Sequence, residues 1–149
     1  MLTLEFWRQA PVEILPVGIF RDPARVVSSL VTRSPMRPAR GLGLWRRYNR
    51  LLLGLHRADP FPLLCFDTTP EGFESQLGRL IDLLNVELGD RVKLSAGAAH
   101  SFFTPELIHA TKPVPDLFAG PAHDEDRVKQ LLADSENLYT SLRARSLAE

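Results

Sequence analysis

The stretch Val12–Leu30, with the sequence VEILPVGIFRDPARVVSSL, decides the fold. Residues Glu13–Phe20 are apolar on nearly consecutive positions, which is typical of a strand buried on both faces of a parallel sheet. Asp22 can cap a helix, and Pro23 suits a first helical turn because its missing N–H would have had no partner there. The stretch therefore predicts a strand, a sharp turn and a helix over Pro23–Thr32.

Arg21 stands where the predicted strand ends and the predicted helix begins. An arginine beside free helix N–H groups forms a site for an anion, most often a phosphate. On local physics alone the plainer interpretation is favoured: Asp22 uses those N–H groups itself and leaves Arg21 as a solvated surface charge.

Alternating elements are expected over the next part of the chain. In order, they are a proline-containing loop over Ser34–Arg40, a helix over Gly41–Arg57, a strand over Pro62–Phe66 and a helix over Glu71–Asn85. Thr68 or Thr69 can cap the last of these helices. Trp45, Tyr48 and Leu51 fall on the apolar stripe of the long helix, so we expect them in the core.

The rest of the chain is less regular. Residues 86–123 are rich in glycine, alanine and proline and predict an irregular, loop-rich segment, and Asp124–Leu147 predicts a C-terminal helix. The acidic residues that open this helix suit its positive end better than they suit a metal site. His56, His100, His109 and His123 show no metal-binding spacing, so no metal is expected. We expect one domain over residues 1–149.

Only two strands are predicted, and a two-stranded sheet leaves two edges open. Either another chain supplies further strands, or an edge of the sheet is exposed. We therefore expect a homo-oligomer or a complementing chain as partner.

Composition excludes several classes of protein. Lys+Arg and Asp+Glu are 18 each, so the chain lacks the basic excess of a general nucleic-acid binder. No apolar stretch approaches the roughly 20 residues that span a bilayer. Met1–Arg8 has no basic start or long apolar segment and does not predict a signal peptide. Cys65 is the only cysteine, which favours a reducing, cytoplasmic setting.

Arg21 and Ser29 stand eight residues apart across the predicted strand end and helix. This stretch resembles the 3′-phosphate-binding segment of the sulfotransferase family that uses 3′-phosphoadenosine 5′-phosphosulfate (PAPS), in its bacterial branch. The resemblance covers roughly residues 3–110. Further similar segments follow in the same order, namely Gly43–Arg50, Leu63–Asp67, Gln76–Leu84 and Phe102–Leu107.

The resemblance implies an α/β fold, a partial P-loop-NTPase-like sulfotransferase domain with few parallel strands packed by several helices. It implies transfer of a sulfuryl group from PAPS to a hydroxyl or amine of a small-molecule, glycan or peptide acceptor. Arg21 and Ser29 would hold the 3′-phosphate of PAPS or of its product 3′-phosphoadenosine 5′-phosphate (PAP), with Ser28 as a second candidate hydroxyl. Phe66 stands where the family often has a tyrosine near the adenine.

The chain also departs from the family pattern. The 20 residues before Arg21 hold no glycine-rich loop of the kind that binds the 5′-phosphosulfate, and the family's usual general base comes from the same missing region. Asp67 and Thr68 replace a glutamate and an aspartate. We therefore expect the C-terminal portion of such a domain, incomplete alone, with catalytic residues unassigned. The alternative is a non-catalytic remnant that binds a nucleotide or a protein. Arg46, Arg47 and Arg50 would be a solvated face, or would meet a phosphosulfate or an acidic acceptor.

Overall fold

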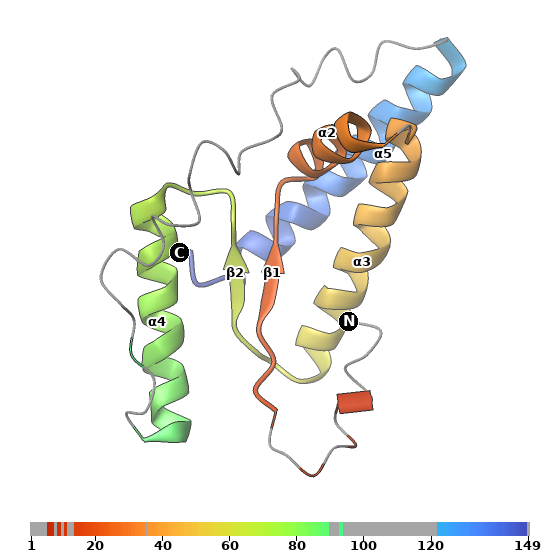
Figure 1. Cartoon of the computed structure of the whole chain (residues 1–149). Helices are drawn as coiled ribbons and strands as arrows, with labels where there is room; N and C mark the ends of the chain where they lie inside the picture. Colours follow the sequence, from red (N-terminus) through yellow and green to blue (C-terminus); the bar gives the residue numbers. More distant parts are fainter. Residues whose placement is uncertain are drawn as a thin grey trace.

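A computed structural model describes residues 6, 7, 9, 11, 14–34, 36–89, 93 and 122–148 of the chain. Its elements are β1 (Gly18–Phe20), α2 (Pro23–Arg33), α3 (Pro38–Ala58), β2 (Leu63–Cys65), α4 (Pro70–Leu88) and α5 (Ala122–Arg143). The expectation of an α/β fold is confirmed at this level (Figure 1).

The two strands form a parallel sheet in which Gly18 pairs with Leu63 and Phe20 pairs with Cys65. Both strands are shorter than predicted. The N–H of Gly18 donates to the carbonyl of Pro62 at 2.9 Å, and the ladder begins there. Prolines 60 and 62 carry no N–H, so the segment before β2 cannot extend the ladder toward its amino end.

Prolines open three of the helices, α2 at Pro23, α3 at Pro38 and α4 at Pro70. The prediction of a loop as far as Arg40 is wrong, because α3 already begins at Pro38, whose fixed φ suits a first turn. Likewise α4 begins at Pro70, and Thr69 is its cap, accepting a hydrogen bond from the N–H of Gly72 at 3.1 Å.

The far ends of the last two helices also differ from prediction. The helix α4 runs to Leu88 and ends at Gly89, whose φ of 67° is a left-handed conformation that suits glycine. The helix α5 ends at Arg143, not Leu147. The chain then turns back, and the N–H of Leu147 donates to the carbonyl of Leu63 at 2.9 Å. Most of the predicted irregular segment 86–123 lies outside the described residues.

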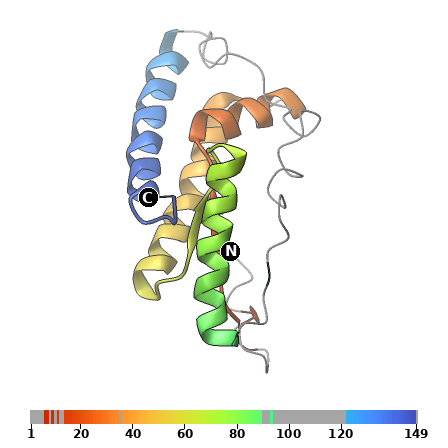
Figure 2. The same cartoon turned by 90° about the vertical axis from the view of Figure 1, so that its left-hand side faces the viewer.

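Three apolar clusters hold the elements together. On one face of the sheet, β1 and β2 pack with α3 and α5 through Phe20, Leu52, Leu53, Phe61, Leu63, Cys65 and Leu142. On the other face, α4 covers β2 through Leu64, Phe73 and Leu80. Between α2, α3 and α5 lie Val27, Leu42 and Val128. Figure 2 views the molecule from the α4 side, with α4 in front of the strands.

The core face of α3 differs from the predicted stripe. Trp45 is buried as expected, but Tyr48 and Leu51 are exposed. A polar residue, Asn49, is buried instead, and its side-chain amide donates to the carbonyl of Trp45 at 2.8 Å. Because this bond satisfies the amide within the helix, a polar side chain can occupy the interior there.

One edge of the sheet is covered and the other is open. The outer edge of β2 is capped by the Gln76 side chain, which bonds both backbone groups of Cys65, and by Leu147. On β1, Gly18 faces β2, so the alternation of a parallel ladder turns the backbone groups of Ile19 toward the open edge. The side chains of Leu15, Val17 and Ile19 are exposed, with Ile19 at 56%. In the described part of the chain, no further strand pairs with β1.

Among the helices the structure describes, none is both long enough and apolar enough to cross a membrane.

Candidate functional site

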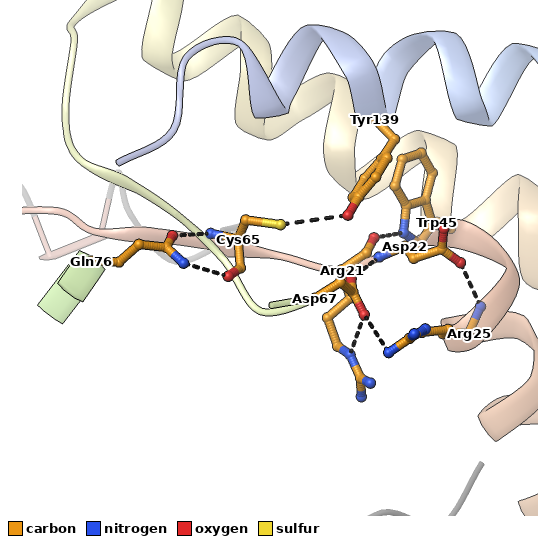
Figure 3. A network of polar contacts seen from close by, with 8 residues as sticks. All are labelled: Arg21, Asp22, Arg25, Trp45, Cys65, Asp67, Gln76 and Tyr139. Carbon is orange, nitrogen blue, oxygen red and sulfur yellow. Dashed lines mark hydrogen bonds and ion pairs between the residues drawn. The ribbon is translucent and has the colours of Figure 1, made fainter. Parts of the chain in front are cut away.

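The candidate site lies where both strands end. Arg21 follows β1, while Phe66 and Asp67 follow β2, and the carboxyl ends of parallel strands share one edge of a sheet. In open α/β sheets this edge is where ligands usually bind. Figure 3 shows the polar network around Arg21, with residues from both strand ends, α2 and α3.

Arg21 is held on two sides. Its guanidinium carbon lies 4.7 Å from the centroid of the Phe66 ring, a cation–π contact, and its Nε lies 3.7 Å from Oδ1 of Asp67. Its backbone is fixed from α3, because the indole N–H of Trp45 donates to the Arg21 carbonyl at 3.0 Å. The position of Arg21 therefore depends on residues from two other parts of the fold, the end of β2 and α3.

Asp67 is the centre of the charge network. Its side chain is only 7% exposed, and it accepts a hydrogen bond from the N–H of Asp22. Besides Arg21, the guanidinium of Arg25 lies 3.6 Å from its Oδ1. Asp22 itself caps α2 by accepting from the N–H of Arg25 at 2.9 Å. The cluster thus contains two arginines and two carboxylates, and it carries no formal net charge.

The arginines still have donors to offer. The Arg21 side chain is 39% exposed and Arg25 is 65% exposed. Within the described residues, the Arg21 guanidinium makes no hydrogen bond: the contact to Asp67 is an ion pair beyond hydrogen-bond distance. A planar guanidinium whose N–H groups are not used by the protein can donate a bidentate pair of hydrogen bonds to a phosphate or carboxylate.

The two candidate serines are separated by burial. Ser28 is 3% exposed, so it lies inside the fold. Ser29 is half-buried and stands one turn beyond Arg25, on the same face of α2. It lies roughly 9 Å along the helix axis from Pro23, at about 1.5 Å per residue. Of the pair, Ser29 therefore has the better access to a ligand.

Sequence reasoning missed Arg25 and the role of Asp67. The signal for Arg25 was its spacing, since it stands four residues from both Arg21 and Ser29. Asp67 was treated only as a departure from a family pattern, whereas it pairs with both arginines. Asp67 and Arg21 are 46 positions apart in the sequence, so their contact depends on the register of the sheet.

A second polar pair lies on the α3–α5 side of the sheet. The thiol of Cys65 and the hydroxyl of Tyr139 are 3.5 Å apart, and the Tyr139 ring packs edge-on against Phe20. Burial, together with the hydrogen bond to Cys65, raises the pKa of Tyr139 above its ordinary value. The contact between Tyr139 and Cys65 therefore joins α5 to the sheet.

The histidines give no metal site among the described residues, where no group of three potential ligands occurs. Nδ1 of His56 lies 2.9 Å from the carbonyl of Phe61, which ties the end of α3 to the approach of β2. His100, His109 and the segment Phe102–Leu107 lie outside the described residues, as does the side chain of His123.

Comparisons of this chain with protein-family models, with curated proteins and with solved structures found no match. Inferences about function therefore depend on the geometry of the strand-end site.

Proposed function

We propose that this chain forms the 3′-phosphate half of a PAPS site in a sulfotransferase-type domain with a P-loop-NTPase-like fold. One observation carries the proposal: Arg21, at the carboxyl end of β1, lies on the Phe66 ring and has exposed guanidinium donors beside the start of α2. A cation and an aromatic surface side by side suit a phosphate attached to a purine nucleoside.

Each residue of this half-site has a distinct role in the proposal. Arg21 and Arg25 bind the 3′-phosphate and release Asp67 in exchange, and the hydroxyl of Ser29 donates to a phosphate oxygen. Phe66 offers its ring to the adenine. Trp45 is a positioning residue, because it acts only through the Arg21 carbonyl.

PAPS, when bound, supplies the sulfuryl group that passes to a hydroxyl or amine acceptor and leaves PAP behind. The described residues contain no group that we assign to that transfer. In this proposal the phosphosulfate and the acceptor are held by groups from a complementing chain or from parts of the protein beyond the described residues.

The test is calorimetric titration of the full chain with PAP, set against 5′-AMP, which lacks the 3′-phosphate. We expect PAP to bind and 5′-AMP to bind at least about tenfold more weakly, since a charge-assisted hydrogen bond contributes about 1.5–3 kcal/mol. Arg21→Ala should remove that preference. Arg33→Ala is the matched control, because Arg33 is exposed in the last turn of α2, the helix that follows Arg21.

Two outcomes would contradict the proposal. One is equal affinity for PAP and 5′-AMP, and the other is a PAP affinity that Arg21→Ala leaves unchanged. Circular dichroism of each variant verifies that the loss is not a loss of folding.

A second candidate, a non-catalytic protein-interaction role, is favoured by the open edge of β1 and its exposed Leu15, Val17 and Ile19. An edge strand with exposed apolar side chains can accept a further strand. Light scattering of the purified chain tests it. A dimer that Ile19→Lys dissociates, without any nucleotide binding, would select this candidate over the first.

A further inference from the structure

The helix α3 is unusually basic for this protein. Over Pro38–Ala58 it carries five arginines and no aspartate or glutamate, whereas the whole chain has equal numbers of basic and acidic residues. Like charges four residues apart on a helix destabilise it, and Arg46 and Arg50 are such a pair. Carboxylates on the same helix, which would offset this repulsion, are absent.

Three of these arginines line one cavity. Its volume is about 560 Å³, and among the described residues its lining is Gly43, Arg46, Arg47, Arg50 and Leu51. The spacing of these five positions places them on a single face of α3. The cavity is largely open to solvent, and its volume falls within the range of small-molecule sites. It shares no residue with the strand-end site around Arg21.

Arg46 is held by an ion pair with a carboxylate of α5, whereas Arg47 and Arg50 have no such pair among the described residues. The guanidinium of Arg46 is 2.9 Å from Asp134 of α5 and its side chain is 16% exposed. Asp134 is itself held by the amide of Gln130 at 3.0 Å. Arg47 and Arg50 are exposed and have no ion pair within the described part of the chain. The cavity therefore carries a surplus of about two positive charges.

Gly43 keeps the cavity open. A Cβ placed on Gly43 would meet no heavy atom within 4 Å, so the space above this position is empty and no packing demand requires a glycine there. Glycine in a helix interior costs about 0.5–1 kcal/mol relative to alanine. A side chain at this position would instead extend into the cavity that the arginines line.

We propose that this cavity on α3 binds a small molecule with two linked phosphate groups, independently of the proposed nucleotide half-site. Arg46 and Arg50 are one helical turn apart, with Cβ atoms about 5–6 Å from each other. Guanidinium groups carried along this face can each take one phosphate of a diphosphate, which distributes its negative charge over the row of arginines. Arg47 then completes the neutralisation of its charge.

The experiment uses inorganic pyrophosphate as the probe, titrated calorimetrically into the full chain at constant ionic strength. Arg47→Gln and Arg50→Gln should each weaken binding at least about tenfold. Arg57→Gln is the matched control. It removes the same charge from the same exposed face of α3, two turns beyond Arg50 and outside the cavity lining.

A second pair of variants changes the volume of the cavity and leaves the charge of its lining unchanged. Gly43→Leu should block binding while all three arginines remain, and Gly43→Ala should leave it nearly unchanged. Arg21→Ala should retain the pyrophosphate binding that Arg50→Gln weakens, which separates this site from the strand-end site.

Three outcomes would overturn the proposal. They are no binding by the unmodified chain, equal weakening in Arg57→Gln and Arg50→Gln, and loss of binding in Arg21→Ala with retention in Arg50→Gln. The second would indicate diffuse attraction to a basic helix, and the third a single anion site at the strand ends.

Discussion

The side-chain amide of Gln76 forms two hydrogen bonds with the backbone of Cys65, accepting from its N–H at 2.8 Å and donating to its carbonyl at 3.0 Å. Gln76 stands on α4 and is 1% exposed. Its amide thus takes the place of the next strand at the outer edge of β2. A helix residue closes one edge of this sheet without any further strand.

Replacing Gln76 with methionine should lower the free energy of unfolding by about 2–4 kcal/mol, because two buried backbone groups lose their partners at about 1–3 kcal/mol each. Urea denaturation followed by circular dichroism measures it. Gln130→Met, at an exposed position of α5, should change stability by less than about 0.5 kcal/mol. Similar losses in both variants would show that the Gln76 bonds are not what stabilises this edge.

Two glycines should respond to alanine in opposite directions. A Cβ at Gly18 of β1 would stand 2.6 Å from Leu63 and 2.7 Å from Leu52, both buried, so Gly18→Ala should destabilise by about 1–3 kcal/mol. A Cβ at Gly54 of α3 meets nothing within 4 Å, so Gly54→Ala should stabilise by about 0.5–1 kcal/mol. Thermal unfolding of both variants checks the pair, and a Gly18→Ala protein as stable as the unmodified chain would contradict the packing described here.

Neutralising Asp67 should separate its effect on nucleotide affinity from its effect on stability. Asp67→Asn removes the charge that competes for Arg21 and Arg25, so affinity for PAP should rise several-fold. Stability should fall by about 1–3 kcal/mol, because two ion pairs to a nearly buried carboxylate are lost. Calorimetry and urea denaturation measure the two quantities. A fall in PAP affinity would mean that the carboxylate is needed to hold Arg21 in place.

Stability at alkaline pH should depend on Tyr139. Burial and the bond to Cys65 raise its folded-state pKa above the ordinary value of 10.0. The folded protein then keeps the proton that the unfolded chain releases, so this stabilisation is complete below pH 10 and is lost as pH rises toward the folded pKa. Denaturant midpoints between pH 8 and 11 should fall less steeply in Tyr139→Phe. Tyr48→Phe, at an exposed tyrosine, should behave like the unmodified chain.

Local chemistry was enough to predict most elements. The apolar run before Arg21 predicted the carboxyl end of the first strand. Asp22 and Pro23 predicted the start of α2, and the threonines before Pro70 predicted the start of α4, each to within a residue or two. The strands' full lengths and the start of α3 were not predicted. Strand length depends on which partner groups can pair, and a proline such as Pro38 is compatible with both a loop and a first turn.

The site illustrates the same division. Arg21 was proposed as an anion site from its place between strand and helix, and Ser29 from the resemblance to a 3′-phosphate-binding segment. The contact of Arg21 with Asp67 could not be predicted, because it depends on the parallel register that sets Phe20 beside Cys65. Nor could sequence distinguish Ser28 from Ser29, since adjacent helical positions differ only in what packs against them.

The sequence by itself determined where α2 and α4 begin to within a residue, which segments are apolar enough for a sheet, and that α3 carries no carboxylate. These are properties of neighbouring residues, and they follow from backbone geometry and side-chain chemistry. Only the tertiary structure decided which edge of the sheet is closed and which arginines are paired. Those outcomes join residues that are distant in the sequence, as Leu147 and Leu63 are at β2 and Arg46 and Asp134 are at the cavity, and even Gln76 and Cys65 are 11 positions apart. Contacts of this kind exist only after the elements have packed.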